Sequence, residues 1–442
     1  MPIRQISGHA DLSYFLLSYS AEGVEQTKDP DAPAGLLSER IIERLVSTPV
    51  TDVFLISHGW KGDVPAAIKQ YDRWISSTAA CANDQMNIRQ ARPEFRSLLV
   101  GLHWPSLPWG DEHLEGGDVS FSGIEHSPLD DLVDEYAERL ADTPAARDAL
   151  RAIFEAAMDD IAPARLSPAV RDAYLVLDRE SGLGSEQEGA APGADREPFD
   201  PERAYLNAAD EAADFGTISL DGILAPLRQL SFWKMKDRAR CFGESGGHQL
   251  LKSLQVAAEA SGRTVRFHLM GHSFGCIAVS AMLAGPNGKG TLDPVKSLFL
   301  VQGALSLWSY CSKIPYSPGR PGYFRSILAN HKVQGPIVAT FSEHDRAVGK
   351  YYPLGAGLGQ QVSYAVGEFP KYGGLGIFGV RGPGIEIEDR EMLDREGAYG
   401  FEPGKVYNLD AAAYISKMQG RGGAHNDIAH AEVAHAFWEA VR

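Results

Sequence analysis

Cysteine is scarce in this 442-residue chain, and its placement argues against one class of site. The cysteines are far apart, at Cys81, Cys241, Cys276 and Cys311. No two of them form a CxxC pair, and no cluster of His, Cys, Asp and Glu has the spacing of metal ligands, so no metal site is expected. The simplest interpretation is a reduced, cytoplasmic protein, although secretion from a longer precursor would fit the same residues.

Long apolar runs and an excess of basic residues are also lacking. No window reaches the roughly 18 apolar residues of a membrane span, and the N-terminus does not resemble a signal peptide. Lys and Arg number 42 against 58 Asp and Glu, a net charge of −16. Nucleic acids and anionic membranes attract clustered Lys and Arg, so neither is expected as a partner. The apolar fraction of 44% and the charged fraction of 23% are those of a soluble globular protein.

What the sequence does contain is a strand-turn-helix pattern from Val265 to Leu283. An apolar run breaks at Gly-His-Ser-Phe-Gly, residues 271–275, and resumes as an apolar run with helical character. This pattern places Ser273 at the apex of a sharp turn, where the two glycines avoid collisions with the neighbouring strand and helix. Ser273 is therefore a candidate nucleophile.

A second Gly-x-Ser-x-Gly match, at residues 243–247, lacks this context. It follows a basic segment, FWKMKDRARCF, that contains no strand-like run. We expect it to be a loop that opens the next helix, which makes Ser245 the lesser candidate.

Buried strands are expected where continuous apolar runs end in turn signals. Such runs lie within residues 11–20, 53–56, 97–104, 295–305, 335–345 and 405–411. Segments with helical spacing separate several of these runs. The alternation predicts an α/β fold with a doubly wound, mostly parallel sheet.

Residues 105–246 interrupt this alternation. They contain several segments with helical spacing and no clear strand signal, and Ser167-Pro168 is typical of a helix start. We expect a large helical cap insertion here, with a flexible polar linker near 182–202, between the core segments 1–104 and 247–442. The glycine-rich segment 346–403 carries an acidic run that is expected to be a solvated face.

Four separated motifs follow one another in an informative order. They are His-Gly-Trp at 58–60, the turn at Ser273, Ser-Glu-His-Asp ending at Asp345, and Ala-His-Asn-Asp around His425. In this order the chain resembles the α/β-hydrolase superfamily, and most generally its esterase and lipase-like members, over roughly residues 10–104 and 247–442. The resemblance implies a catalytic triad of Ser273 as nucleophile, His425 as base and Asp345 as the acid that orients the base.

Other residues compete for the base and acid positions. Two alternative bases lie within the expected final helix: His430 and His435. Three alternative acids lie on the same loop as Asp345, at the end of the last strand, or just past His425: Glu343, Asp410 and Asp427. The sequence leaves these alternatives open.

The resemblance also implies two backbone N–H donors for an oxyanion hole. Phe274, the residue after the nucleophile, would supply one, and Trp60 the other, with Gly59 as its alternative. Side chains expected at the same edge of the sheet form a candidate substrate pocket: His58, Trp104, Trp109, His272 and Trp308. An aromatic pocket suits an apolar or aromatic substrate group. The alternative is that the aromatic rings pack the insertion onto the sheet.

These features predict a cofactor-independent serine hydrolase that cleaves a small-molecule carboxylic ester through an acyl-enzyme intermediate. Amide or peptide cleavage, or acyl transfer to an alcohol, would use the same triad, and the sequence does not separate them. A non-catalytic binding protein on the same fold is a further alternative. A dehalogenase-like or epoxide-hydrolase-like enzyme would need an aspartate nucleophile, and Ser273 argues against it.

Overall fold

A mostly parallel sheet forms the centre of the fold. The computed structural model describes residues 3–6, 9–27, 35–60, 64–106, 129–214, 222–352 and 369–442. Among these residues nine strands form one sheet in the order β1-β2-β4-β3-β5-β6-β7-β9-β8, in which only the β1–β2 pair is antiparallel. The strands are β1 (Ile3–Ile6), β2 (His9–Ser18), β3 (Asp52–Ser57), β4 (Ser97–His103), β5 (Arg266–His272), β6 (Ser297–Val301), β7 (Ile337–Phe341), β8 (Ile387–Glu391) and β9 (Val406–Asp410).

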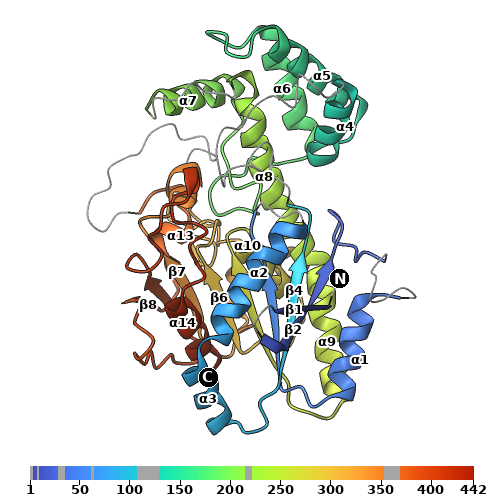
Figure 1. Ribbon diagram of the computed structural model, residues 1–442. Coiled ribbons are helices and arrows are strands. Elements are labelled where there is room, and N and C mark those ends of the chain that lie inside the picture. Colours follow the sequence, from blue (N-terminus) through green and yellow to red (C-terminus); the bar gives the residue numbers. More distant parts are fainter. Residues whose placement is uncertain are drawn as a thin grey trace.

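Helices cover both faces of this sheet (Figure 1). On one face lie α1 (Leu37–Ser47), α9 (His248–Ala260), α10 (Gly275–Ala284) and α11 (Arg325–Ala329). On the other lie α2 (Val64–Ala79), α3 (Ala82–Ala91) and α14 (Ala431–Val441). The predicted α/β class, with a mostly parallel sheet between helices, is confirmed. Among the described helices, none is both long and apolar enough to cross a membrane.

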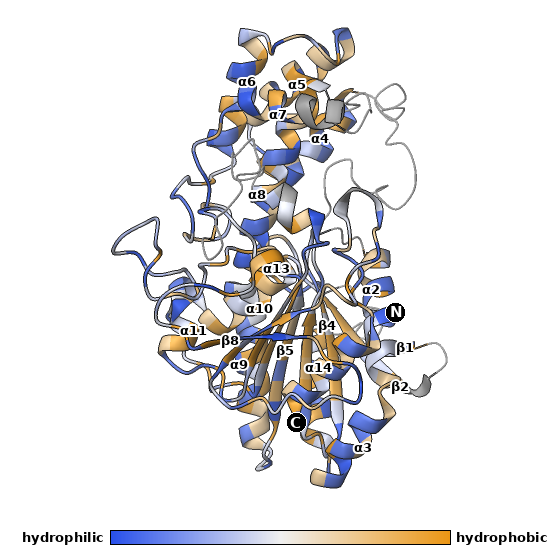
Figure 2. Cartoon of the chain, turned by 90° about the vertical axis from the view of Figure 1, so that its left-hand side faces the viewer, coloured by the Kyte–Doolittle hydropathy of each residue, from blue (hydrophilic) through white to orange (hydrophobic). Residues whose placement is uncertain are grey.

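Burial on both faces explains the unbroken apolar runs of the central strands. In β3, Val53 and Leu55 pack among the helices of one face, whereas Phe54 and Ile56 pack among those of the other. Figure 2 shows the central strands as a mostly hydrophobic layer, with hydrophilic residues concentrated on the helices and loops around it. β8 was not predicted, because it is a partly exposed edge strand of mostly charged residues within the acidic run.

The amino ends of three central strands share a buried polar network. His268 of β5 lies between Asp52 of β3 and Ser297 of β6, with Nε2 3.1 Å from an Asp52 oxygen and Nδ1 2.8 Å from the Ser297 hydroxyl. Arg92 donates to the same Asp52 oxygen at 2.7 Å. Burial favours a raised pKa for Asp52, but hydrogen bonds from His268 and Thr51 oppose it and the pKa is lowered. Burial lowers the pKa of His268. The network therefore ties the three strands together.

Between β4 and β5 the described residues form helices and loops but no strand. α4 (Leu129–Leu140), α5 (Pro144–Asp159), α6 (Pro168–Glu180) and α7 (Pro201–Asp214) gather beyond one end of the sheet, and α8 (Ala225–Phe242) runs from them to the sheet (Figure 1). The predicted start of α6 is confirmed, because the Ser167 hydroxyl accepts a hydrogen bond from the Val170 N–H at 3.3 Å.

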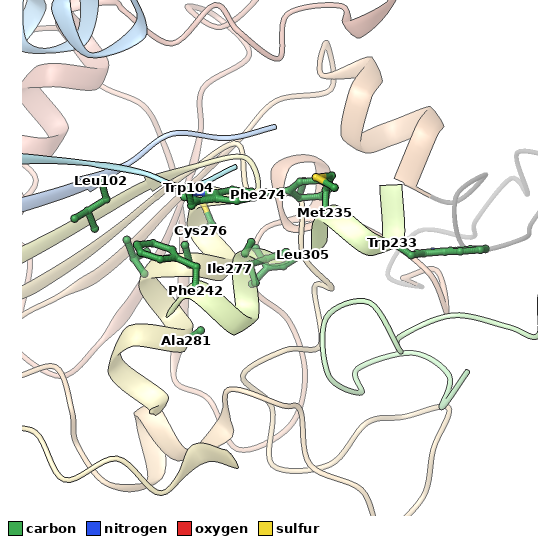
Figure 3. Close-up of a cluster of buried hydrophobic side chains, with 14 of the residues drawn as sticks. Leu102, Trp104, Trp233, Met235, Phe242, Phe274, Cys276, Ile277, Ala281 and Leu305 are labelled. Atoms are coloured by element: carbon green, nitrogen blue, oxygen red, sulfur yellow. The ribbon is translucent and has the colours of Figure 1, made fainter. Parts of the chain in front are cut away.

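α8 packs closely along α10, the helix that follows β5. Figure 3 shows Met235 and Phe242 of α8 in one cluster with residues of the α10 region: Phe274, Cys276, Ile277 and Ala281. Just after α8, a Cβ on Gly243 would lie 2.4 Å from the Ala278 carbonyl oxygen. The two helices can approach this closely because residue 243 has no side chain.

The structure differs from the flexible linker expected near residues 182–202. This segment is packed, and three of its charged side chains are buried: Glu188, Asp195 and Arg196. Asp195 forms an ion pair with Lys236 of α8 and accepts a hydrogen bond from the Tyr352 hydroxyl at 3.1 Å. Part of the polar composition of the segment therefore serves buried ion pairs.

Glu188 lies fully buried near this ion pair. Burial, and secondly the charge of Asp195, raise the pKa of Glu188 well above the ordinary value for a glutamate. The folded protein therefore favours the protonated form of Glu188.

We predict that Glu188→Gln makes stability less dependent on pH. The folded protein holds this proton more tightly than the unfolded chain, so the stability contribution is complete below the unfolded-state pKa of about 4.3 and falls as the pH rises above it. The loss is about 1.4 kcal/mol per pH unit until Glu188 ionises in the folded state. Thermal denaturation from about pH 5 to pH 8 should therefore show a shallower fall of the melting temperature in Glu188→Gln than in the wild type.

Glu186→Gln is the matched control, because Glu186 is an exposed carboxylate that pairs with Arg320 at the surface. It should keep the wild-type slope. Equal slopes for the wild type and Glu188→Gln would contradict the prediction.

Candidate active site

Three residues selected from the sequence form one hydrogen-bonded chain. The Ser273 hydroxyl is 2.7 Å from Nε2 of His425, and Nδ1 of His425 is 2.8 Å from Oδ2 of Asp345. Because the Asp345 carboxylate can only accept, Nδ1 carries the proton and Nε2 accepts from the serine. The three residues follow β5, β7 and β9, whose carboxyl ends lie at the same edge of the sheet. The arrangement can therefore take a proton from Ser273.

The turn between β5 and α10 holds Ser273 in a strained backbone conformation. Its φ is 57°, in a region that residues other than glycine rarely occupy. A Cβ on Gly271 would lie 2.4 Å from the Gly275 carbonyl oxygen, and a Cβ on Gly275 would lie 2.2 Å from that of Ser57. Both glycines are therefore required by the close approach of the neighbouring backbone.

Asp345 is fully buried, and both of its oxygens are held. Oδ1 accepts a hydrogen bond from the Val348 N–H at 2.9 Å. Oδ2 accepts from His425 and also from the side-chain amide of Gln302 at 3.0 Å. The carboxylate therefore has one defined orientation toward the histidine.

The alternative acids have other surroundings. Glu343 extends into solvent with its side chain 80% exposed, and Asp410 is also exposed. Asp427 is buried, but its Oδ2 accepts from the backbone N–H groups of Ser416 and Lys417. Of the four candidate acids, Asp345 is the one hydrogen-bonded to His425.

The alternative bases are also engaged elsewhere. His430 immediately precedes α14 and pairs with Asp427 at 3.0 Å. His435 lies within α14 and pairs with Asp84 at 2.9 Å. His425 is therefore the candidate base that the structure brings to Ser273.

Residues 243–247 form a wide π-type helical turn between α8 and α9, and the expected loop is not present there. The Ser245 hydroxyl is exposed and donates to the Cys241 carbonyl oxygen at 2.6 Å. The Ser245 hydroxyl is thus bonded to its own helix, and among the described residues no histidine pairs with it.

His272 was expected in the substrate pocket, but the structure places it behind the base. Its Nε2 donates to the His425 carbonyl oxygen at 2.9 Å, and its Nδ1 accepts from the Gln70 amide at 2.6 Å. A β-bridge between Asp345 and Gly423 ties the same loop to the acid loop. Both contacts fix the position of His425.

The two expected oxyanion donors lie next to the nucleophile. Phe274 follows Ser273 and immediately precedes α10. A Cβ on Gly59 would lie 2.5 Å from the Ser273 Cβ, so the backbone that leads into Trp60 passes directly against the nucleophile. Within the described ranges neither the Phe274 nor the Trp60 N–H donates to a protein acceptor. Such N–H groups can bind an oxyanion that develops beside the serine.

Aromatic rings from four parts of the chain meet beside these donors. The Phe232 ring of α8 lies 5.8 Å from the Trp60 ring and 5.2 Å from the Phe274 ring, between centroids. The Trp60 and Phe274 rings are 5.7 Å apart, and Tyr352 lies 6.1 Å from Phe232. The insertion therefore contacts this edge of the sheet directly through α8.

Two other expected pocket residues, His58 and Trp104, are buried in the core. Their rings stack at 5.4 Å, and Nε1 of Trp104 donates to the Ser57 hydroxyl at 3.2 Å. Burial and the neighbouring His103 lower the pKa of His58 to about 3, so its ring is neutral. The rings of His58 and Trp104 thus pack in the core just after β3 and β4, which agrees with the alternative that the aromatic residues have a packing role.

Trp308 is also buried, in a separate apolar cluster with Leu307, Cys311 and Ile314. Its Nε1 donates to the Lys371 carbonyl oxygen at 3.1 Å. It therefore has a packing role as well. Trp109 lies outside the described residues.

The sequence did not single out three residues that the structure brings to the site. Gln302 contacts the acid, and Phe232 and Tyr352 belong to the aromatic group. A polar residue directly after a buried strand and before a glycine could have marked Gln302. Nothing in the helical spacing of α8 distinguished Phe232 from its neighbours, because its partners are far away in the sequence.

The described residues contain no group of three or more His, Cys, Asp or Glu side chains placed to hold a metal ion. Comparison of the chain with protein-family models, with curated proteins and with solved structures returned no match.

Proposed function

We propose that the protein is a serine hydrolase that cleaves carboxylic esters through an acyl-enzyme intermediate. The observation that carries the proposal is the chain from Ser273 through His425 to Asp345, with hydrogen bonds of 2.7 and 2.8 Å. A serine hydroxyl is a weak nucleophile at neutral pH and needs a base at this distance. A serine with only a structural role would need neither the strained backbone nor a buried carboxylate behind the histidine.

In the first half of the reaction, Ser273 Oγ bonds to the ester carbonyl carbon while its proton passes to Nε2 of His425. Asp345 keeps the other proton on Nδ1 and stabilises the imidazolium. The carbonyl oxygen becomes an oxyanion, which the N–H groups of Phe274 and Trp60 bind. The Nε2 proton then passes to the departing alkoxide, the carbon–oxygen bond breaks, and the alcohol leaves an acylated Ser273.

In the second half, His425 takes a proton from a water molecule, whose oxygen bonds to the acyl carbon. A second oxyanion forms in the same place and is bound by the same two N–H groups. As this intermediate collapses, Ser273 Oγ leaves and recovers the proton from Nε2. The products are the carboxylic acid and the free enzyme.

The order of the elements supports an α/β-hydrolase fold for the core. In that fold the nucleophile, acid and base follow different strands of one sheet, in that order along the chain. Here they follow β5, β7 and β9, and the helical residues lie between β4 and β5. We assign the core to residues 1–104 and 247–442 and the cap to residues 105–246.

The aromatic group beside the oxyanion donors supports a substrate with an apolar or aromatic group. Phe232 is the member contributed by the cap, and its ring touches those of both proposed donors. A substrate group bound here would contact rings from the cap and from the core together.

Ser273→Ala is expected to reduce hydrolysis of p-nitrophenyl esters by at least about 10⁴-fold, because it removes the hydroxyl that would form the acyl-enzyme. A fluorophosphonate probe should label the wild type on Ser273, which peptide mapping would locate. Ser245→Ala is the matched control, because it alters the serine of the second Gly-x-Ser-x-Gly sequence. It should retain both ester hydrolysis and the labelling of Ser273.

Retained ester hydrolysis in Ser273→Ala, or label on Ser245, would overturn the assignment. Matched p-nitrophenyl esters and p-nitroanilides of the same acids would separate ester from amide cleavage.

Phe232→Leu is expected to shift substrate preference toward bulkier acyl groups. The smaller side chain would open space beside Trp60 and Phe274, and the relative kcat/KM for long against short p-nitrophenyl esters should rise about tenfold. Phe154→Leu is the control, because Phe154 is equally apolar but packs on Tyr136 within the cap. An unchanged chain-length profile in Phe232→Leu would contradict the prediction.

A further inference from the structure

Gln302 shares with Ser273 an uncommon backbone conformation. It directly follows β6, its φ is 46°, and it is fully buried. A buried amide is destabilising unless its polar atoms are paired. Nε2 of Gln302 donates to Asp345 Oδ2 at 3.0 Å and to the Gly376 carbonyl oxygen at 3.2 Å. Oε1 accepts from the Thr340 hydroxyl at 3.0 Å, so the amide is held from both ends.

The backbone on either side of Gln302 holds the nucleophile. The Ser273 N–H donates to the Val301 carbonyl oxygen at 3.1 Å, and the Ser273 carbonyl oxygen accepts from the Ala304 N–H at 3.2 Å. The segment from Val301 to Ala304 therefore holds the Ser273 backbone in place through two hydrogen bonds. The side chain of Gln302, which lies within this segment, reaches Asp345.

The backbone of Gly376 also packs directly against Asp345 and Gln302. A Cβ on this residue would lie 2.9 Å from the Gln302 carbonyl carbon and 3.1 Å from Asp345 Oδ2. Its N–H donates to the Gly303 carbonyl oxygen and its own carbonyl oxygen accepts from the Ser342 N–H, each at 2.9 Å. The loops after β6 and β7 are thus joined across the carboxylate.

We propose that Gln302 is a positioning residue that couples the nucleophile to the acid; this inference rests on the proposed function. Its amide N–H and the Val348 N–H each hold one oxygen of Asp345, which leaves a single orientation for the carboxylate. Oδ2 is thereby presented to His425. Gln302 also fixes the distance between Ser273 and Asp345, because its backbone belongs to the segment that is hydrogen-bonded to the Ser273 backbone.

Gln302→Met tests the hydrogen bond, since methionine has a similar length but no N–H donor. The rate at which a fluorophosphonate labels Ser273 is expected to fall by about tenfold or more, as for the loss of one hydrogen bond to a charged group. Gln255→Met is the matched control. Gln255 is a buried amide that pairs with the backbone of Asp293, and its replacement should leave the labelling rate unchanged.

Gln302→Glu tests the positioning role through the pH dependence of the labelling rate, which a merely structural role would not change. Two carboxyl groups about 3 Å apart share one proton, and the protonated glutamate can donate to Asp345 in place of the amide. Labelling relative to the wild type should therefore be nearly restored at low pH and should decline as the pH rises and the shared proton leaves. A structural defect would instead be independent of pH.

The hydrogen bond between His425 and Asp345 gives a second readout that needs no reaction. The Nδ1 proton should produce a downfield proton NMR signal, assigned by its loss in His425→Gln, and Gln302→Met should shift or broaden it. If Gln302→Met does not fold, Thr340→Val removes the hydroxyl that holds the Gln302 amide and is expected to change the signal and the rate in the same direction.

Two outcomes distinguish failure of the inference from failure of the proposed function. If Ser273 is labelled in the wild type and Gln302→Met keeps the wild-type rate and NMR signal, the positioning role is wrong and the hydrolase proposal stands. If Ser273 is not labelled in the folded wild type, the hydrolase proposal is wrong and the catalytic part of the inference falls with it. The NMR comparison then decides whether Gln302 orients Asp345.

Discussion

The close approach of backbone segments around Ser273 is the constraint on which the rest of the site depends. Gly59, Gly271 and Gly275 have no room for a Cβ, and the strained serine lies among them. The strain is offset by two backbone hydrogen bonds: the Ser273 N–H donates to the carbonyl oxygen of Val301, the last residue of β6, and the Ser273 carbonyl oxygen accepts from the Ala304 N–H. The proposed oxyanion donors can lie beside the hydroxyl only because these segments meet without side chains between them.

Local patterns in the sequence predicted the features that local physics determines. Unbroken apolar runs predicted the central strands, because both faces of the sheet are buried. The order of the motifs predicted that Ser273, Asp345 and His425 would meet. The pairing of Gln302 with Asp345 could not be predicted from the sequence. It joins residues 43 apart and depends on β6 and β7 lying side by side. Composition alone also misjudged residues 182–202, where Asp195 forms a buried ion pair with Lys236.

Under the proposed function, the insertion contributes residues to the site through α8. Phe232 touches both proposed donor residues, and Lys236, one turn further along α8, reaches the core through Tyr352 as well as pairing with Asp195. A movement of α8 would therefore disturb the oxyanion side of the site and a buried ion pair together. If the protein is a hydrolase as proposed, this coupling favours an α8 that keeps one position during the reaction.

The buried network of Asp52, His268 and Ser297 contains the same three side-chain types as the proposed triad, at similar distances. This network lies at the amino ends of the strands, whereas the proposed triad lies at their carboxyl ends, and all three of its side chains are buried. A serine, a histidine and an aspartate in contact can therefore have a purely structural role, as these three do in joining β3, β5 and β6. The same three side-chain types tie strands together at their amino ends and, under the proposed function, carry out the reaction at the carboxyl ends, where Ser273 lies on a strained turn next to the backbone of Gly59.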